Sequence, residues 1–226
     1  MSITRLRSHA SGRAAIALAA ALLLGACSRP ANEGPLRSES RSVGDFHSVN
    51  VRGAANASIQ VGPAASLTIS AGENTLQNLT TTVREGMLIV EQKKGWWLSH
   101  GNVELQITLP VLQEVVISGA GNADITDARG ESLELSLQGA GNLVAKGEIG
   151  TLAVNINGAG NANLGGLRAR AAKVVVNGTG NVSVHATEEL DAVVNGVGSV
   201  RYIGTPPKLD TKVNGVGSIV QAPAGP

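Results

Sequence analysis

Aromatic residues are almost absent from this sequence, since two tryptophans, one tyrosine and one phenylalanine make up 2% of its 226 residues. A core with so few rings has to be built from valine, isoleucine, leucine and alanine. Small and β-branched side chains of this kind suit thin, regularly stacked β-sheets. The composition therefore argues against a bulky globular core.

The sequence also has a single cysteine, no excess of basic residues and no cluster of histidines. The lone cysteine, Cys27, excludes an internal disulfide. A formal net charge of +1 is far from the basic footprint of a nucleic-acid-binding protein, so no nucleic acid is expected as a partner. His47, His100 and His185 stand singly, without the spacing of zinc ligands, and we expect neither a metal nor another cofactor.

Residues 1–26 have the pattern of a bacterial lipoprotein signal peptide. Three arginines precede an apolar run over residues 14–24, which is too short to span a bilayer. The run ends in LLLGAC at 22–27, which resembles the lipobox. This resemblance implies lipidation of Cys27 and anchoring in the cell envelope, with an unmodified cysteine as the alternative. By the same resemblance, Ser28 after the cysteine, in place of aspartate, implies the outer membrane in a Gram-negative cell.

The remaining chain divides by composition into three parts. Residues 27–43 contain the lipidated cysteine and a segment rich in serine, proline, arginine and glutamate, which we expect to be a flexible tether. Residues 44–222 alternate apolar and polar side chains and form the folded domain, and residues 223–226 are a short tail.

A Gly-x-Gly signature returns six times between residues 119 and 218, at steps of 18 to 20 residues. Such a period indicates one structural unit copied along an axis. The glycines of the six copies are Gly119 and Gly121, Gly139 and Gly141, Gly158 and Gly160, Gly178 and Gly180, Gly196 and Gly198, and Gly215 and Gly217. We expect them to be structural corners, where positive φ or close backbone approach requires glycine.

Alignment on these glycines reveals columns of similar residues. Apolar residues stand two positions before each first glycine, and mostly apolar residues four positions before it, so both columns should face a common core. Each repeat is then a strand, a corner, a second strand and a return loop. The predicted fold is all-β, a right-handed parallel β-helix-like solenoid with about 19–20 residues per coil.

Asparagine follows the second glycine in four consecutive copies, at Asn122, Asn142, Asn161 and Asn181. Stacked coils would place these amides roughly 4.8 Å apart, where they can form a hydrogen-bonded ladder. Ser199 and Ser218 take the place in the last two copies, so the ladder should fade there.

Several stretches in order resemble one bacterial family. DFHSVNVRGAANASIQVG, LTISAGENTLQNLTTTVREGMLIV and LPVLQEVVISGAGNADI, with the recurring GAGN corners, are similar to the putative auto-transporter adhesin head GIN domain over about residues 43–221. The resemblance implies a parallel β-helix-like fold at the cell envelope and supplies no catalytic residues. KKGWWLSHGN at 93–102 departs from the family pattern.

Other motifs give weaker indications. Asp124, Asp127, Glu131 and Glu134 lie close in sequence but favour solvated loop charges over a glycosidase pair. The corners lack the aspartates of calcium-binding repeats and the following helix of a dinucleotide loop. Trp96 and Trp97 are candidate ligand-binding residues, because exposed aromatics stack on sugars and anchor interfaces; the alternatives are a cap on the solenoid end or a hydrophobic loop.

Three functions remain. The first is a non-catalytic adhesion or binding module that contacts a cell-surface glycan or protein. The second is an envelope component that self-associates, and the third, less favoured, is an enzyme acting on a polysaccharide.

Overall fold

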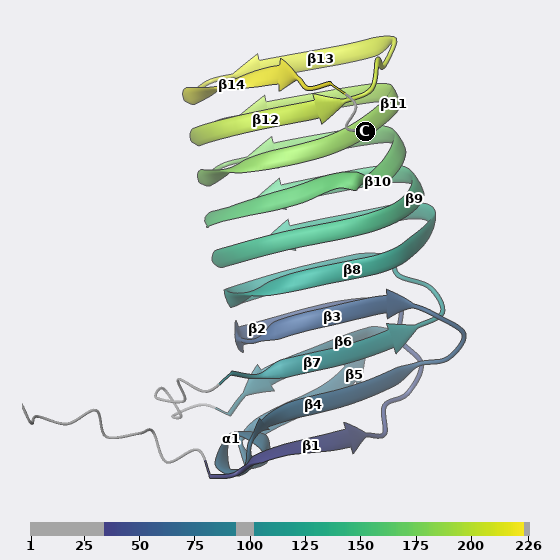
Figure 1. The fold of residues 1–226 in the computed structure, drawn as a ribbon, viewed down its shortest axis with the longest axis vertical. Coiled ribbons are helices and arrows are strands. Elements are labelled where there is room, and N and C mark those ends of the chain that lie inside the picture. Colours follow the sequence, from purple (N-terminus) through teal and green to yellow (C-terminus); the bar gives the residue numbers. More distant parts are fainter. Residues whose placement is uncertain (1–33, 94–101, 224–226) are drawn as a thin grey trace, which may run out of the picture. The chain divides into compact units, whose positions relative to one another are not determined.

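The computed structural model describes residues 34–93 and 102–223, all of which belong to one compact unit. They form a stack of β-coils in which α1 is the one helix among the described residues (Figure 1). The elements are β1 (Leu36–Arg41), β2 (Ser48–Ala54), β3 (Asn56–Val61), β4 (Ser66–Gly72), α1 (Glu73–Gln77), β5 (Leu79–Arg84), β6 (Met87–Gln92), β7 (Glu104–Leu109), β8 (Glu114–Leu137), β9 (Ala140–Ile156), β10 (Ala159–Val176), β11 (Thr179–Val194), β12 (Val197–Ile203), β13 (Lys208–Val213) and β14 (Val216–Gln221).

The repeats form a parallel β-solenoid of about five turns, which confirms the predicted fold class. Each strand pairs in parallel with its equivalent one coil along, and the signature residues match one another. Ala140 of β9, for example, pairs with Ala159 of β10, and Ala159 pairs with Thr179 of β11. Equivalent positions of the repeat therefore lie in line from one level of the stack to the next.

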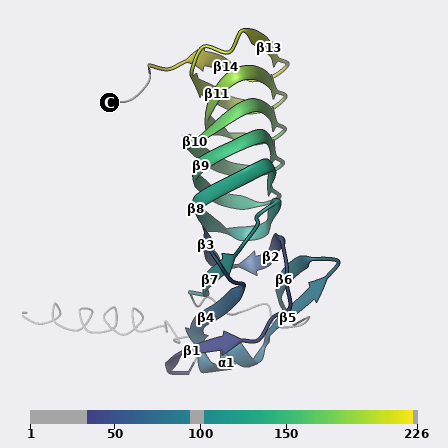
Figure 2. The same cartoon turned by 90° about the vertical axis from the view of Figure 1, so that its right-hand side faces the viewer.

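Most return loops of the predicted repeat are not loops. β8 to β11 each continue as one strand through the return bend, and β8, β9 and β10 pair with the next coil on both sides of it (Figure 2). In the coil after β11, residues 204–207 separate β12 from β13, so a loop is present there. Register shifts between Ile125 and Ala128, and between Asn163 and Gly166, take up the difference in coil length. A bulge keeps the backbone hydrogen bonds on both sides of the bend, which a loop would sacrifice.

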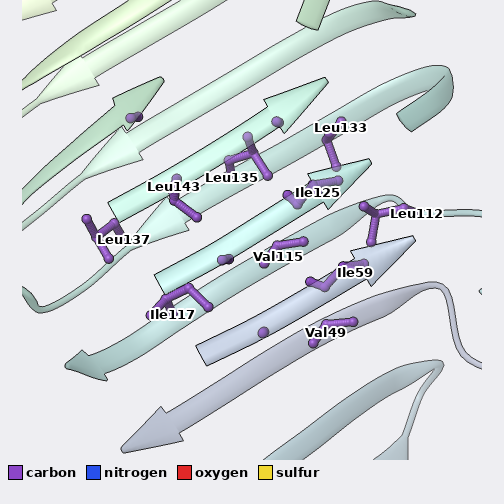
Figure 3. Packing of buried hydrophobic residues seen from close by; sticks show 14 of the residues in the cluster. Val49, Ile59, Leu112, Val115, Ile117, Ile125, Leu133, Leu135, Leu137 and Leu143 are labelled. Atoms are coloured by element: carbon purple, nitrogen blue, oxygen red, sulfur yellow. The ribbon is translucent and has the colours of Figure 1, made fainter. Parts of the chain in front are cut away.

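The core fills the space between the two sides of the coils, as Figure 3 shows for residues of the first coils. In the first five copies both predicted inward columns are buried. They comprise Val115, Leu135, Val154, Val174 and Ala192, and Ile117, Leu137, Ile156, Val176 and Val194. In the sixth copy Thr211 and Val213 are exposed, because no described coil lies beyond them.

The N-terminal strands form the first part of the stack and supply its cap. β2 pairs in parallel with β8, so Gly53 and Ala54 pair with Gly119 and Ala120 as a degenerate first repeat. β4 pairs antiparallel with β1 and β7, and β5 forms an antiparallel hairpin with β6. The stack therefore changes from parallel to antiparallel pairing at this end.

The tether predicted over residues 27–43 is wrong in its second half. Residues 36–41 form β1 and pair with β4 along their full length. The composition misled because β1 lies at the sheet edge and is exposed over most of its length, so it needs few apolar side chains.

Candidate functional site

The six Gly-x-Gly signatures lie at one corner of the solenoid, where stacked backbones approach closely. A Cβ on any of the twelve signature glycines would overlap a backbone carbonyl oxygen of the coil before it. Only Gly119 among them has a positive φ, +153°. Close approach between coils, and not an unusual torsion angle, is therefore the main reason for glycine here.

The predicted asparagine ladder is present and is longer than expected. The Nδ2 groups of Asn122, Asn142, Asn161 and Asn181 each donate to the Oδ1 atom of the asparagine one coil earlier, at 2.8 to 3.2 Å. The ladder starts at Asn56, in the degenerate repeat. It ends at Ser199, whose hydroxyl lies 3.2 Å from the Oδ1 atom of Asn181, so the expected fading begins one coil later. We call these six residues the first amide ladder.

A second amide ladder runs along the other side of the corner. Asn177, Asn195 and Asn214 donate through Nδ2 to the Oδ1 atoms of Asn157, Asn177 and Asn195, at 2.7 to 2.8 Å. Sequence reasoning placed these residues outward without recognising a ladder. The available signal was the asparagine that stands before the first glycine in four successive copies. It did not decide the matter, because outward asparagines could equally be solvated one by one.

An exposed column of alanine, threonine and valine residues separates the two ladders. It consists of the middle residue of each signature, namely Ala120, Ala140, Ala159, Thr179, Val197 and Val216. We call the two ladders and this column the amide edge. Each amide keeps hydrogen-bonding capacity toward solvent after its ladder bond is made. The edge can therefore bind a partner through a regular row of donors and acceptors.

Several predicted site residues lie outside the described residues. These are Cys27 with its neighbour Ser28, the tryptophans Trp96 and Trp97, and His100. Their roles stay predictions.

Three of the four acidic residues considered for catalysis are engaged separately on the surface. Asp127 accepts a hydrogen bond from Gln60 at 3.1 Å, and Glu134 accepts one from Asn155 at 3.3 Å. Glu131 lies 3.6 Å from Arg170, and both side chains are well exposed. Within residues 34–93 and 102–223, no group of three or more His, Cys, Asp or Glu side chains comes together to hold a metal ion.

A shallow hollow at the N-terminal end is lined by Arg41 and six neighbours from β1, α1 and β5. Arg41 donates to the carbonyl oxygens of Leu76 and Leu79 at 2.9 and 2.8 Å. Its guanidinium thus joins β1 to α1 and β5. Arg41 therefore stabilises the N-terminal cap, and its guanidinium group is already bound to backbone carbonyl oxygens.

The described part of the chain contains no helix with the length and apolar character needed to cross a membrane. What it presents is a β-solenoid scaffold with a regular, exposed polar edge. The chain belongs to the family described as putative auto-transporter adhesin, head GIN domain, whose sequence profile matches residues 45–206.

Solved structures of low sequence identity share this fold. A putative adhesin from Bacteroides fragilis NCTC 9343 is 23% identical, with a TM-score of 0.64 over 83% of this chain and 97% of its own. A putative adhesin from Parabacteroides distasonis ATCC 8503 is 20% identical, with a TM-score of 0.53 over 84% and 98% of the two chains. One from Parabacteroides merdae ATCC 43184 is 21% identical, with a TM-score of 0.52 over 84% and 97%. No curated protein matches the sequence.

Proposed function

We propose that this chain is a non-catalytic adhesion module of the bacterial cell envelope, anchored by lipid on Cys27, whose amide edge contacts a surface glycan or protein. The amide edge is the observation that supports this role. Its ladders repeat the same polar groups over successive coils, which suits an extended partner with many weak, regularly spaced contacts. Family membership agrees with surface binding in general.

The adhesion role predicts that bulk and charge on the amide edge abolish binding. Ala140 and Ala159 are exposed and paired in successive coils, so Ala140→Glu/Ala159→Glu would place two carboxylates between the ladders without removing a ladder bond. We expect at least about a tenfold loss of binding to a glycan array or to intact bacterial cells.

The matched control is Ser132→Glu/Thr151→Glu. Ser132 and Thr151 are also exposed and paired in successive coils, but they lie away from the corner. The control should bind like the parent. Equal binding by both variants would exclude the amide edge, and loss only in Trp96→Ala/Trp97→Ala would assign adhesion to the 93–102 segment.

Lipid anchoring predicts that Cys27→Ala releases the chain from the membrane fraction. The substitution removes the thiol that carries the diacylglyceryl group, so incorporation of a fatty-acid probe should also cease. The companion variant Ser28→Asp should keep the label and, in a Gram-negative cell, shift the chain to the inner membrane. If Cys27→Ala still sediments with membranes as the parent does, the anchor proposal is wrong.

A further inference from the structure

The last coil, β13 and β14, has no described coil on its far side. Leu209, Val213 and Val220 are 46%, 41% and 43% exposed. Leu190, which pairs with Leu209 one coil earlier, is fully buried. Among the described residues, five of the seven exposed large apolar side chains lie between residues 197 and 220, and two of these five, Val197 and Val216, belong to the column of the amide edge.

The two ends of the stack differ in how their strand edges are treated. At the N-terminal end, α1 contributes the buried Leu76, and edge strand β1 carries Arg37, Glu39 and Arg41. β13 carries three charges of its own, at Lys208, Asp210 and Lys212, so the two ends differ through α1, which packs against β1 and β4, and not through the number of edge charges. At the other end, β13 pairs only with β11 and β14 only with β12 among the described strands, so the outer edge of each is open. The open end is therefore suited to adding a strand.

The sequence of β13 is chemically symmetric about Thr211. Asp210 and Lys212 flank this residue, and Leu209 and Val213 lie one step further out. Leu209, Thr211 and Val213 continue the inward columns, whereas Asp210 and Lys212 alternate with them. An antiparallel copy centred on Thr211 would place Asp210 opposite Lys212 and Leu209 opposite Val213, twice each.

The charges of β13 are available for such pairing. Lys208 is engaged within the chain, with Nζ 2.6 Å from the Oε1 atom of Glu189, and this hydrogen bond is the main cause of the raised pKa of Lys208. Among the described residues, Asp210 and Lys212 have no ion-pair partner. Asp210 also stacks on Asp191, so a cation on its open side would relieve a like-charge contact.

We propose that the C-terminal coil is a dimer interface, at which β13 strands of two copies of this chain pair antiparallel about a twofold axis at Thr211. A twofold interface requires that residue i contacts residue j and that j contacts i, which the pattern of β13 fulfils. The twofold axis passes between the two β13 strands at Thr211, perpendicular to the sheet. The two apolar cores therefore become continuous, and the exposed Leu209 and Val213 are buried.

Other arrangements fit less well. Centring the pair on Asp210 would oppose Asp210 to itself and Lys208 to Lys212, and like charges directly opposite are destabilising. A shift by one residue would bring apolar side chains to the outer face. Head-to-tail stacking would place the open end against the capped, charged β1. The dimer centred on Thr211 is therefore the favoured assembly.

Disulfide formation in full-length variants tests the register. Thr211→Cys would bring two cysteines opposite each other with Cα atoms about 4.5 to 5.5 Å apart, within reach of a disulfide. In Val213→Cys the register separates the two cysteines by about 13 Å along the strands. We expect a linked dimer on a non-reducing gel for Thr211→Cys and background levels for Val213→Cys and the parent. Absence of linking at Thr211, or equal linking at both sites, would overturn the register.

A charge swap tests whether the pairing holds the dimer together. Asp210→Lys should raise the dimer dissociation constant about tenfold or more, because two attractive pairs become repulsive. Asp210→Lys/Lys212→Asp should restore it, and the exposed mid-stack control Asp124→Lys should leave it unchanged. Light scattering over a concentration series measures the constant, and circular dichroism confirms folding. A monomeric parent, a dimeric Asp210→Lys or a double variant without rescue would each refute the interface.

Discussion

The chain carrying Gly178→Ala should lose about 3 kcal/mol or more of its free energy of unfolding, as measured by urea denaturation followed by circular dichroism. The added Cβ would overlap the carbonyl oxygen of Gly158, which accepts the backbone hydrogen bond of Thr179 at 2.8 Å. Neither atom can move aside alone, because Gly158 and Gly178 lie in short bends whose flanking strands are paired with neighbouring coils. The coils would have to separate and strain both amide ladders.

The middle position of the signature provides the matched control. Alanine, threonine and valine all occur there in different coils, and the side chain is exposed. Thr179→Ala and Ala159→Thr should therefore change the free energy of unfolding by no more than about 0.5 kcal/mol. A loss below about 1 kcal/mol for Gly178→Ala would show that the coils adjust easily, and close approach would no longer explain the glycines.

Sequence reasoning found the repeat, its inward columns and the first ladder because each depends on a period that the letters display. It could not decide why glycine is required. Positive φ and close approach both select glycine, and the distinction depends on the distance between backbones of neighbouring coils. That distance places eleven of the twelve signature glycines in the second class and leaves Gly119 with both features.

One wrong prediction and one missed feature have the same origin in missing tertiary context. The composition of residues 36–41 suits a tether, yet these residues pair with β4. The local sequence does not reveal that the backbone of β4 is available as a pairing partner. The outward asparagines Asn157, Asn177, Asn195 and Asn214 form a ladder because their coils lie in register. In both cases the partner, and not the residue itself, decides the structure.

The candidate site was predicted only in part for a similar reason. The first ladder was expected from the sequence. Its position beside the exposed column at Ala140 and Ala159, and the presence of a second ladder, became clear only from the geometry of the corner. The open end at β13 was also hidden. The residues of β13 continue the inward columns of the earlier coils. They are exposed only because no described coil follows them.

Leu190→Ala and Leu209→Ala should have very different effects, although the two leucines occupy the same column of the solenoid. Leu190 is fully buried beneath β13, so its truncation leaves a cavity and should cost about 2–5 kcal/mol of the free energy of unfolding. Leu209 is 46% exposed, and its truncation in a monomer should cost less than about 1 kcal/mol.

The comparison also separates the monomer from the proposed dimer through its concentration dependence. In dilute protein Leu209→Ala should unfold almost like the parent. At concentrations where the parent dimerises, the parent should gain stability by mass action and Leu209→Ala should gain less, because its contact with Val213 of the second copy is reduced. Leu190→Ala should show the same deficit at every concentration. If Leu209→Ala instead destabilises dilute protein as strongly as Leu190→Ala does, the last coil is covered within the monomer and cannot serve as the interface.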